Sequence, residues 1–405
     1  MEVKQIGIIK SPVDPDRIRL MAEVSYHDKA FPPESYWFEV SEKYAEFLSN
    51  SGNPWLICLL PLAVTLGEPL HISEPVDCQL YENVQELMHI WKCWYPHLHV
   101  IPIEAEVVHA ERQESPVRVA AFFSGGVDSF FTLLWHNGKS NSSKKFHIED
   151  LLLVCGFDVP LANQEGFFRI RDRLRKVAFE LDKELIDVAT NLRETRWGIT
   201  DWELLSHGAA LGCIALVFEK RYSRVLIAST WGYKNLEPYG SHVMTDHLFS
   251  TSRTKIVHDG ASFSRVNKIE YIAKSDIALR ELRVCWKSRS DENCCVCKKC
   301  YRTMITLELL GELDRCRRFN DSKVDIRRVE KYYSPRHFEN NFLSEVSSLA
   351  VSKGRFDLAK AIDRSRKNSA RLNKLLRIIR SFQNKRFVWR FAHPLERMLL
   401  SHYIT

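Results

Sequence analysis

The sequence lacks a hydrophobic run long enough to cross a membrane. Its most apolar window, from Pro54 to Gly67, contains Pro61 and falls short of the ~20 residues that a membrane-spanning helix needs. The first residues, MEVKQIGIIK, lack the basic segment, apolar run and small-residue cleavage site of a secretory signal. We therefore expect a cytoplasmic protein with no membrane partner.

The composition is that of a folded globular chain. Its 405 residues exceed the usual size of one domain, and 45% hydrophobic with 27% charged residues is ordinary for globular proteins. Eleven cysteines would indicate disulfides in a small secreted domain. In a long chain without a signal they indicate reduced thiols, metal ligands or core packing.

The formal net charge of +7 is unevenly distributed. Residues 321–405 contain 19 Lys and Arg against 8 Asp and Glu, so the rest of the chain is slightly acidic. Such a basic block can bind an anionic partner, including nucleic acid, through phosphate contacts. A solvated helical face explains it as well, and RNA is the less favoured partner.

Hydrophobic patterning divides the chain into three regions. Residues 1–114 mix short strand-like and helical patterns and predict an α+β domain of unknown role, and residues 319–405 form a basic helical region. In residues 115–318, apolar runs at 117–123, 151–157, 185–189 and 225–228 alternate with helical patterns at 164–182 and 202–220. This alternation predicts an α/β fold with a doubly wound parallel sheet, whose ligands lie at the carboxyl ends of its strands.

A glycine-containing loop follows the first of these strands. The stretch SGGVDS comprises Ser124, Gly125, Gly126, Val127, Asp128 and Ser129. A strand that ends in this stretch and continues as a helix presents backbone N–H groups and a helix N-terminus to an anion. The glycines permit close approach and positive φ, the serines donate hydrogen bonds, and Asp128 suits a phosphate-bridging Mg²⁺ ion. The loop therefore predicts a polyphosphate ligand, although it matches neither the G-x-x-x-x-G-K-[ST] nor the G-x-G-x-x-G pattern.

Four cysteines in segment 285–300 have the spacing of a metal site. Cys285, Cys294, Cys297 and Cys300 follow the pattern C-x8-C-x2-C-x2-C, with Cys295 as an additional thiol. Four thiolates complete a tetrahedral zinc site and leave no position for water, so we expect a structural Zn²⁺ that holds the following helix, residues 301–310. An iron–sulfur cluster is an alternative, and a disulfide pair is disfavoured by the compartment.

The SGGVDS loop resembles the signature of the PP-loop ATP pyrophosphatases. That resemblance implies that the loop holds the β- and γ-phosphates of ATP while a substrate oxygen attacks the α-phosphate. Together with the later cysteine spacing, residues 117–312 resemble the 7-cyano-7-deazaguanine synthase family, in which the cysteines bind zinc. The sequence departs from that family at Cys295, where glycine is usual, and at SHGAAL, residues 206–211, where an arginine-containing segment is expected.

The length of the chain is closer to the larger, divergent relatives of that synthase in bacterial antiviral defence systems. These relatives imply that a deazaguanine carboxylate is activated and joined as an amide to an amine, such as the N-terminus of a protein encoded nearby. The sequence contains no glutaminase-like region to generate ammonia, so free ammonium or a partner's amine is the expected nucleophile. Whether the product is an amide or a nitrile stays open.

Further candidate residues follow the other strands. Asp158 follows the second strand and is a candidate for ribose or magnesium, and Asp246 corresponds by position to an aspartate of the resembled family. We expect Asp128 and Asp246 to take part in catalysis. On chemistry alone, Trp231 could stack on a purine-like ring, Arg253 could neutralise a carboxylate or phosphate, and His242 completes the predicted substrate site.

Two other functions fit the same motifs. PP-loop enzymes also activate base carbonyls in tRNA, and a thiolase of that kind would bind RNA and need a persulfide-forming cysteine or an iron–sulfur cluster. A nucleotide-binding regulatory or scaffold protein would bind ATP without turning it over. The leading prediction remains an ATP-dependent ligase that uses ATP, Mg²⁺ and Zn²⁺.

Overall fold

A computed structural model of the chain describes residues 1–109, 118–138, 145–285, 287, 291–334 and 337–383. The chain divides into two compact units, one of Met1–Ser124 with Asp128–Ser262 and one of Gly125–Val127 with Phe263–Thr405. We refer to them as unit 1 and unit 2 and describe each by itself.

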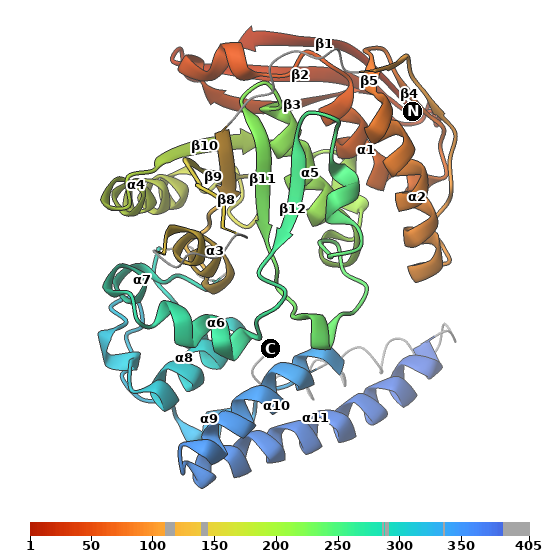
Figure 1. The fold of residues 1–405 in the computed structure, drawn as a ribbon. Helices are drawn as coiled ribbons and strands as arrows, with labels where there is room; N and C mark the ends of the chain where they lie inside the picture. The colour runs from red at the N-terminus through yellow and green to blue at the C-terminus, as the bar shows by residue number, and fades with distance from the viewer. Residues whose placement is uncertain (110–117, 139–144, 286, 288–290, 335–336, 384–405) are drawn as a thin grey trace. The chain divides into compact units, whose positions relative to one another are not determined.

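Unit 1 is built on a ten-stranded sheet in the order β12-β11-β8-β9-β10-β3-β2-β1-β4-β6 (Figure 1). Its strands, together with the separate pair β5–β7, are β1 Glu2–Lys10, β2 Arg17–Ser25, β3 Glu34–Ser41, β4 Leu70–Ile72, β5 Val76–Asp77, β6 Ile103–Glu104, β7 Val107–Val108, β8 Arg118–Phe122, β9 Asp150–Cys155, β10 Glu184–Thr190, β11 Tyr222–Ala228 and β12 Lys255–Asp259. The helices of unit 1 are α1 Asn53–Leu66, α2 Cys78–Trp94, α3 Val127–Asn137, whose first residue belongs to unit 2, α4 Gln164–Glu180 and α5 His207–Val217.

The five strands β8 to β12 pair in parallel. Counted along the chain from β8, their order in the sheet is 3-2-1-4-5, the order of a doubly wound sheet. The predicted α/β class and the predicted strands of this region are therefore confirmed. The strand order reverses between β8 and β11, which is where such sheets bind their ligands.

The amino-terminal strands belong to the same sheet rather than to one of their own. β3 pairs antiparallel with β10 through the partners Ala189–Glu39 and Thr190–Phe38, and β2 and β1 follow it. β2 alternates buried and half-buried residues, because one face of an antiparallel strand covers a core. The expected boundary at residues 114/115 lies in 110–117, outside the described residues.

Helices cover the parallel strands on both faces. Alternate residues of one face, including Phe122 of β8 and Ile227 of β11, share a buried cluster with α5 and α1. On the other face, Asp259 of β12 accepts hydrogen bonds from Thr132 and His136 of α3, at 2.7 and 3.0 Å. The apolar window noted in the sequence is the buried helix α1, and none of the helices in the described residues has the length and apolar character of a membrane span.

The described residues of unit 2 form helices joined by loops. Its helices are α6 Arg265–Ile272, α7 Asp276–Glu281, α8 Lys298–Leu310, α9 Ile326–Val329, α10 His337–Ser352 and α11 Phe356–Gln383. The helix predicted after the cysteines is α8, which begins a turn earlier than expected, immediately after Cys297. The basic carboxyl-terminal region is helical as predicted, as far as it is described.

Candidate functional site: a glycine loop and a four-cysteine centre

The glycine loop joins β8 to α3, as its sequence predicts. β8 ends at Phe122 and α3 begins at Val127, so the loop leads directly into a helix N-terminus. Gly125 has φ +74°, a conformation that favours glycine, and its carbonyl oxygen accepts a 2.9 Å hydrogen bond from the backbone N–H of Arg283. Ser124 is exposed, whereas Ser129 is buried in the first turn of α3.

The topology brings two of the other expected residues to the same edge of the sheet. β9 and β11 flank β8 in parallel, so their carboxyl ends lie beside the loop. Asp158 lies in the exposed turn after β9. Trp231 follows β11, and only 3% of its surface is exposed. The edge thus combines a helix N-terminus, an exposed carboxylate and a buried indole.

Asp246 lies in a buried polar cluster near the carboxyl end of β12. Its carboxylate accepts hydrogen bonds from the Ser241 hydroxyl at 2.7 Å, from the His242 backbone N–H at 3.0 Å and from the His258 ring at 2.7 Å. The residue has no exposed surface. Here Asp246 therefore holds loop 241–246 against β12, and its carboxylate faces protein donors.

His242 lies in the same loop and is buried. Its Nδ1 accepts a 3.0 Å hydrogen bond from the backbone N–H of Met244, and its ring packs edge-on against Trp94 with centroids 4.9 Å apart. Burial lowers the pKa of His242, and the neighbouring His258 lowers it further. The imidazole is therefore neutral over a wider pH range than a solvent-exposed histidine.

The structure places Arg253 apart from the loop. Arg253 lies two residues before β12, and the neighbouring Thr254 hydroxyl donates a 2.8 Å hydrogen bond to the carbonyl of Tyr222, the first residue of β11. Segment 229–254 connects two parallel strands, so it begins at the carboxyl edge and must return to the amino edge. Its first half lies near the glycine loop, whereas the backbone of Arg253 lies at the opposite edge.

Sequence analysis did not identify the contact that holds this segment. Gly208, in the first turn of α5, meets Gly240 so closely that a Cβ on Gly208 would lie 2.0 Å from the Gly240 carbonyl oxygen. His207 packs edge-on against Tyr239, and Tyr239 packs edge-on against Trp231. Burial lowers the pKa of His207. The backbone contact and the aromatic chain fix where loop 229–246 runs, but neither belongs to a recognisable motif.

A methyl group at residue 208 should therefore displace this loop. We expect Gly208→Ala to lower the free energy of unfolding by about 1–3 kcal/mol, because backbone cannot move away as a side chain can. Urea denaturation followed by tryptophan fluorescence measures this change. Gly7→Ala is the control, because its added Cβ would meet no atom nearer than 4.0 Å. Equal stability of both variants would contradict the close approach.

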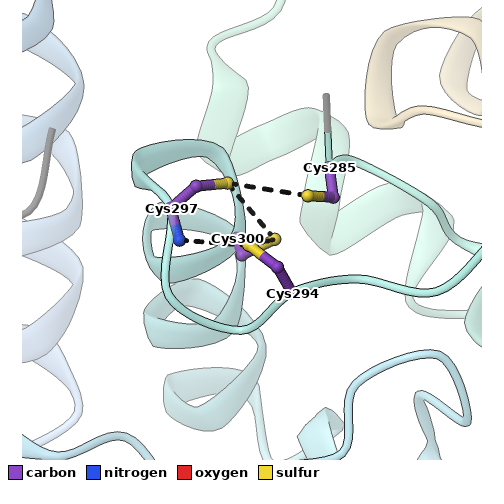
Figure 2. A group of neighbouring side chains, drawn as sticks. All are labelled: Cys285, Cys294, Cys297 and Cys300. Atoms are coloured by element: carbon purple, nitrogen blue, oxygen red, sulfur yellow. Dashed lines mark hydrogen bonds between the residues drawn. The ribbon is translucent and has the colours of Figure 1, made fainter. Parts of the chain in front are cut away.

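The four predicted cysteines form a compact cluster in unit 2 (Figure 2). Their sulfurs all lie within 4.8 Å of one another, with separations of 3.9 Å for Cys285–Cys297, 3.9 Å for Cys294–Cys300 and 3.5 Å for Cys297–Cys300. Sulfurs at about 2.3 Å from a tetrahedral zinc ion lie about 3.8 Å apart. The cluster therefore fits a closed zinc site with four thiolate ligands, and all eleven cysteines are free of disulfides.

The cysteines of this cluster keep their thiol protons unless a metal cation is bound. The hydrogen bond to Cys285 raises the pKa of Cys297 to about 11, and the neighbouring sulfurs of Cys285 and Cys297 raise the pKa of Cys300 as well. Without metal the crowded thiolates would repel one another, so the thiols hold their protons. A bound zinc ion reverses this preference, and its affinity falls as the pH falls.

Asn293 supports the cluster and carries no sequence signal. Its side-chain oxygen accepts hydrogen bonds from the backbone N–H groups of Val284 and Cys285, at 2.8 and 3.1 Å, and its amide nitrogen donates to the Leu282 carbonyl at 2.9 Å. The residue is 2% exposed. It therefore ties the segment that carries Cys285 to the segment that carries Cys294.

Cys295 is not part of the four-sulfur group. Its Sγ contacts the Asn293 carbonyl oxygen at 3.6 Å, and burial raises the pKa of its thiol. Its φ is +54°, in the left-handed region that glycine adopts most readily. This explains physically why glycine would suit the position. Cys155, Cys213 and Cys316 are buried.

Comparison with known proteins found no relative of this chain. No protein-family model, no curated protein and no solved structure matches the chain.

Proposed function

We propose that this protein uses ATP to adenylate a carboxylate on a 7-deazaguanine-like substrate and then transfers the acyl group to an amine or ammonia. The observation that carries this proposal is the glycine loop between β8 and α3. It contains a left-handed Gly125, leads into a helix N-terminus and lies where the strand order of a parallel sheet reverses. Anionic ligands bind at such positions in doubly wound sheets.

In this proposal the loop binds the part of ATP that leaves. The residues from Ser124 to Ser129 surround the β- and γ-phosphates, through backbone N–H groups and two hydroxyls. Asp128, in the first turn of α3, would hold Mg²⁺, which would offset the charge of the leaving pyrophosphate. Holding the pyrophosphate rather than the γ-phosphate favours AMP transfer over phosphoryl transfer.

Two displacement steps account for the proposed reaction. A carboxylate oxygen of the substrate forms a bond to the α-phosphorus of ATP, and the bond from that phosphorus to the bridging oxygen breaks, so pyrophosphate leaves. The nitrogen of the amine then attacks the acyl carbon of the mixed anhydride, loses a proton to solvent and expels AMP. The product is an amide, and a nitrile would require a second activation of that amide.

The remaining expected residues receive different roles. Asp158 is assigned to the ribose or magnesium, because it follows the strand next to the loop. Trp231 and His242 are assigned to the wall of the substrate site, and Asp246 supports that wall through Ser241 and His258. The four cysteines are assigned to a structural zinc ion. We assign the protein to the cytoplasm and its acceptor amine to a partner protein encoded nearby.

Pyrophosphate release tests this function. We expect release from ATP and 7-carboxy-7-deazaguanine with Mg²⁺ present, and a decrease of about 100-fold or more in Asp128→Asn, because the variant loses the charge that holds the metal. Asp172→Asn, a change at an exposed residue of α4, is the matched control and should keep full activity.

The alternative functions predict different results. ATP binding without pyrophosphate release, with every carboxylate and neighbouring protein supplied, would indicate a nucleotide-binding scaffold. Pyrophosphate release that depends on tRNA and a sulfur donor would indicate a tRNA thiolase. No binding of ATP with magnesium in calorimetry would refute all three functions together.

A further inference from the structure

Helix α11 in unit 2 is amphipathic along its described length, and its inner face is fixed by hydrogen bonds. Leu372, Leu376 and Ile379 of this face share a buried cluster with Tyr333. The Ser365 hydroxyl donates a 2.6 Å hydrogen bond to the Tyr332 carbonyl oxygen. Because these contacts determine the rotation of the helix, they also determine which residues face outward.

The outward face carries a row of cations. Lys360, Arg364, Lys367, Arg371 and Lys374 are all exposed and follow one another at intervals of three or four residues. At about 100° and 1.5 Å per residue, they occupy an arc of roughly 80° over about 21 Å of helix. We call these five residues the basic stripe.

Most of the basic stripe forms no ion pair within the described part of the chain. Arg364 forms a 2.8 Å ion pair with Glu330 of α9. Over the described part of the chain, no ion pair involves the other four stripe residues. The nearby Asp363 pairs instead with Arg366, at 3.6 Å. A solvated helix usually alternates charges of opposite sign on such a face.

The arrangement has an energetic cost in the isolated protein. The stripe places like charges at four successive i,i+3 or i,i+4 spacings: 360–364, 364–367, 367–371 and 371–374. Each such like-charge pair destabilises an exposed helix. An anionic partner along the stripe would remove this repulsion, so the charge pattern favours an extended polyanion over a single small anion.

We propose that the basic stripe binds the phosphate backbone of a nucleic acid. A duplex carries one phosphate per about 1.7 Å of its axis, so a ~21 Å stripe spans enough phosphates to pair each cation. A membrane surface fits less well, because an interfacial helix inserts a wide apolar face, whereas Leu372, Leu376 and Ile379 of α11 are buried in unit 2 and the exposed apolar residues beside the stripe are Leu375 and Ile378. The stripe has few hydrogen-bonding groups of other kinds, so binding is independent of base sequence. This proposal does not depend on the proposed reaction.

The test compares a stripe variant with a charge-matched control. The stripe variant is Lys367→Gln/Arg371→Gln/Lys374→Gln in the full chain. The control is Lys29→Gln/Lys176→Gln/Lys220→Gln, which removes the same charge from exposed residues of unit 1. Fluorescence anisotropy with a 20-base-pair RNA duplex and a DNA duplex of the same sequence, over a range of salt concentrations, measures binding.

We expect the stripe variant to bind at least tenfold more weakly than the wild type at 100 mM salt. The slope of the logarithm of its binding constant against the logarithm of salt concentration should be less steep by about 3, one for each lost phosphate contact. The control should keep the wild-type slope. The RNA and DNA arms determine whether the 2′-hydroxyl contributes to binding.

Three results would overturn the proposal. They are no binding of either duplex by the wild type, an unchanged slope in the stripe variant, or an equal loss in the control variant. Binding to phosphatidylserine vesicles but to neither duplex would assign the stripe to a membrane surface instead. Circular dichroism and zinc content verify folding, and the single variant Arg371→Gln, with an expected slope change of about 1, replaces the triple variant if the latter does not fold.

Discussion

Cys297→Ser should abolish stoichiometric zinc binding and destabilise unit 2. Cys297 lies 3.9 Å from the Cys285 sulfur and 3.5 Å from the Cys300 sulfur, and it immediately precedes α8. A serine hydroxyl does not ionise near neutral pH, so it cannot replace the thiolate. Structural zinc sites contribute ~10–16 kcal/mol of binding free energy at pH 7, and most of this would be lost.

The measurement is metal content by elemental analysis, combined with thermal unfolding. We expect about one zinc per wild-type chain, almost none in Cys297→Ser, and a melting temperature lower by roughly 20 °C or more. The same analysis distinguishes zinc from an iron–sulfur cluster, because the cluster would add iron and colour.

Cys295→Ser is the matched control for this experiment. It removes a neighbouring buried thiol whose Sγ contacts the Asn293 carbonyl oxygen and is outside the four-sulfur group. This variant should keep one zinc per chain. Loss of zinc in Cys295→Ser, or its retention in Cys297→Ser, would contradict the assigned ligand set.

Asp150→Ala should cause a large loss of stability in unit 1. Asp150 begins β9, has no exposed surface and accepts hydrogen bonds from Arg118, from Arg221 at 2.7 Å and from the Tyr222 hydroxyl at 2.9 Å. Its removal leaves the guanidinium of Arg221, which is 8% exposed, without its closest carboxylate. Breaking a buried ion pair in this way costs about 3–5 kcal/mol.

The same residue determines part of the pH dependence of stability. Burial alone would raise the pKa of Asp150, but hydrogen bonds from Arg118 and Arg221 outweigh it, and the pKa is lowered. The folded state therefore binds this proton less readily than the unfolded state, whose carboxyl has a pKa of about 3.9. The stabilisation is present above that pH and is lost as the pH falls through the lower, folded-state value.

Urea denaturation between pH 7 and pH 3 measures both effects. We expect wild-type stability to fall on acidification, and Asp150→Ala to be less stable at pH 7 with a weaker dependence on acid. Asp172→Ala removes an exposed carboxylate that pairs with Arg171 on α4, so it should change stability by less than ~1 kcal/mol. Equal losses of stability in the two variants would show that the buried hydrogen bonds of Asp150 stabilise the fold no more than an exposed ion pair does.

The strands and the cysteine cluster could be predicted because their signals are local. Runs of four to eight apolar residues alternating with helical patterns indicated β8 to β11, and the spacing of the cysteines places their sulfurs on one short segment. The left-handed Gly125 agrees with the turn inferred for the loop. In each case the interacting residues are near one another in sequence.

The other features depend on residues that are far apart in the chain. The pairing of β3 with β10 joins residues about 150 positions apart, and the same alternating pattern would equally suit a separate sheet. The burial of Asp246 depends on His258 in a later strand, and the placement of Arg253 depends on where the connection to β12 returns. Asn293 makes ordinary hydrogen bonds that leave no pattern in the sequence.

The sequence by itself determined the α/β class, the glycine loop at the end of a strand and the four cysteines, because backbone geometry and short ligand spacings act over a few residues. Only the tertiary structure decided that the amino-terminal strands extend the central sheet, that Asp246 faces protein donors, and which face of α11 carries its cations outward. These outcomes depend on which surfaces, far apart in sequence, are buried against one another. Because the hydrophobic effect is non-directional, the local sequence does not specify which surfaces pair.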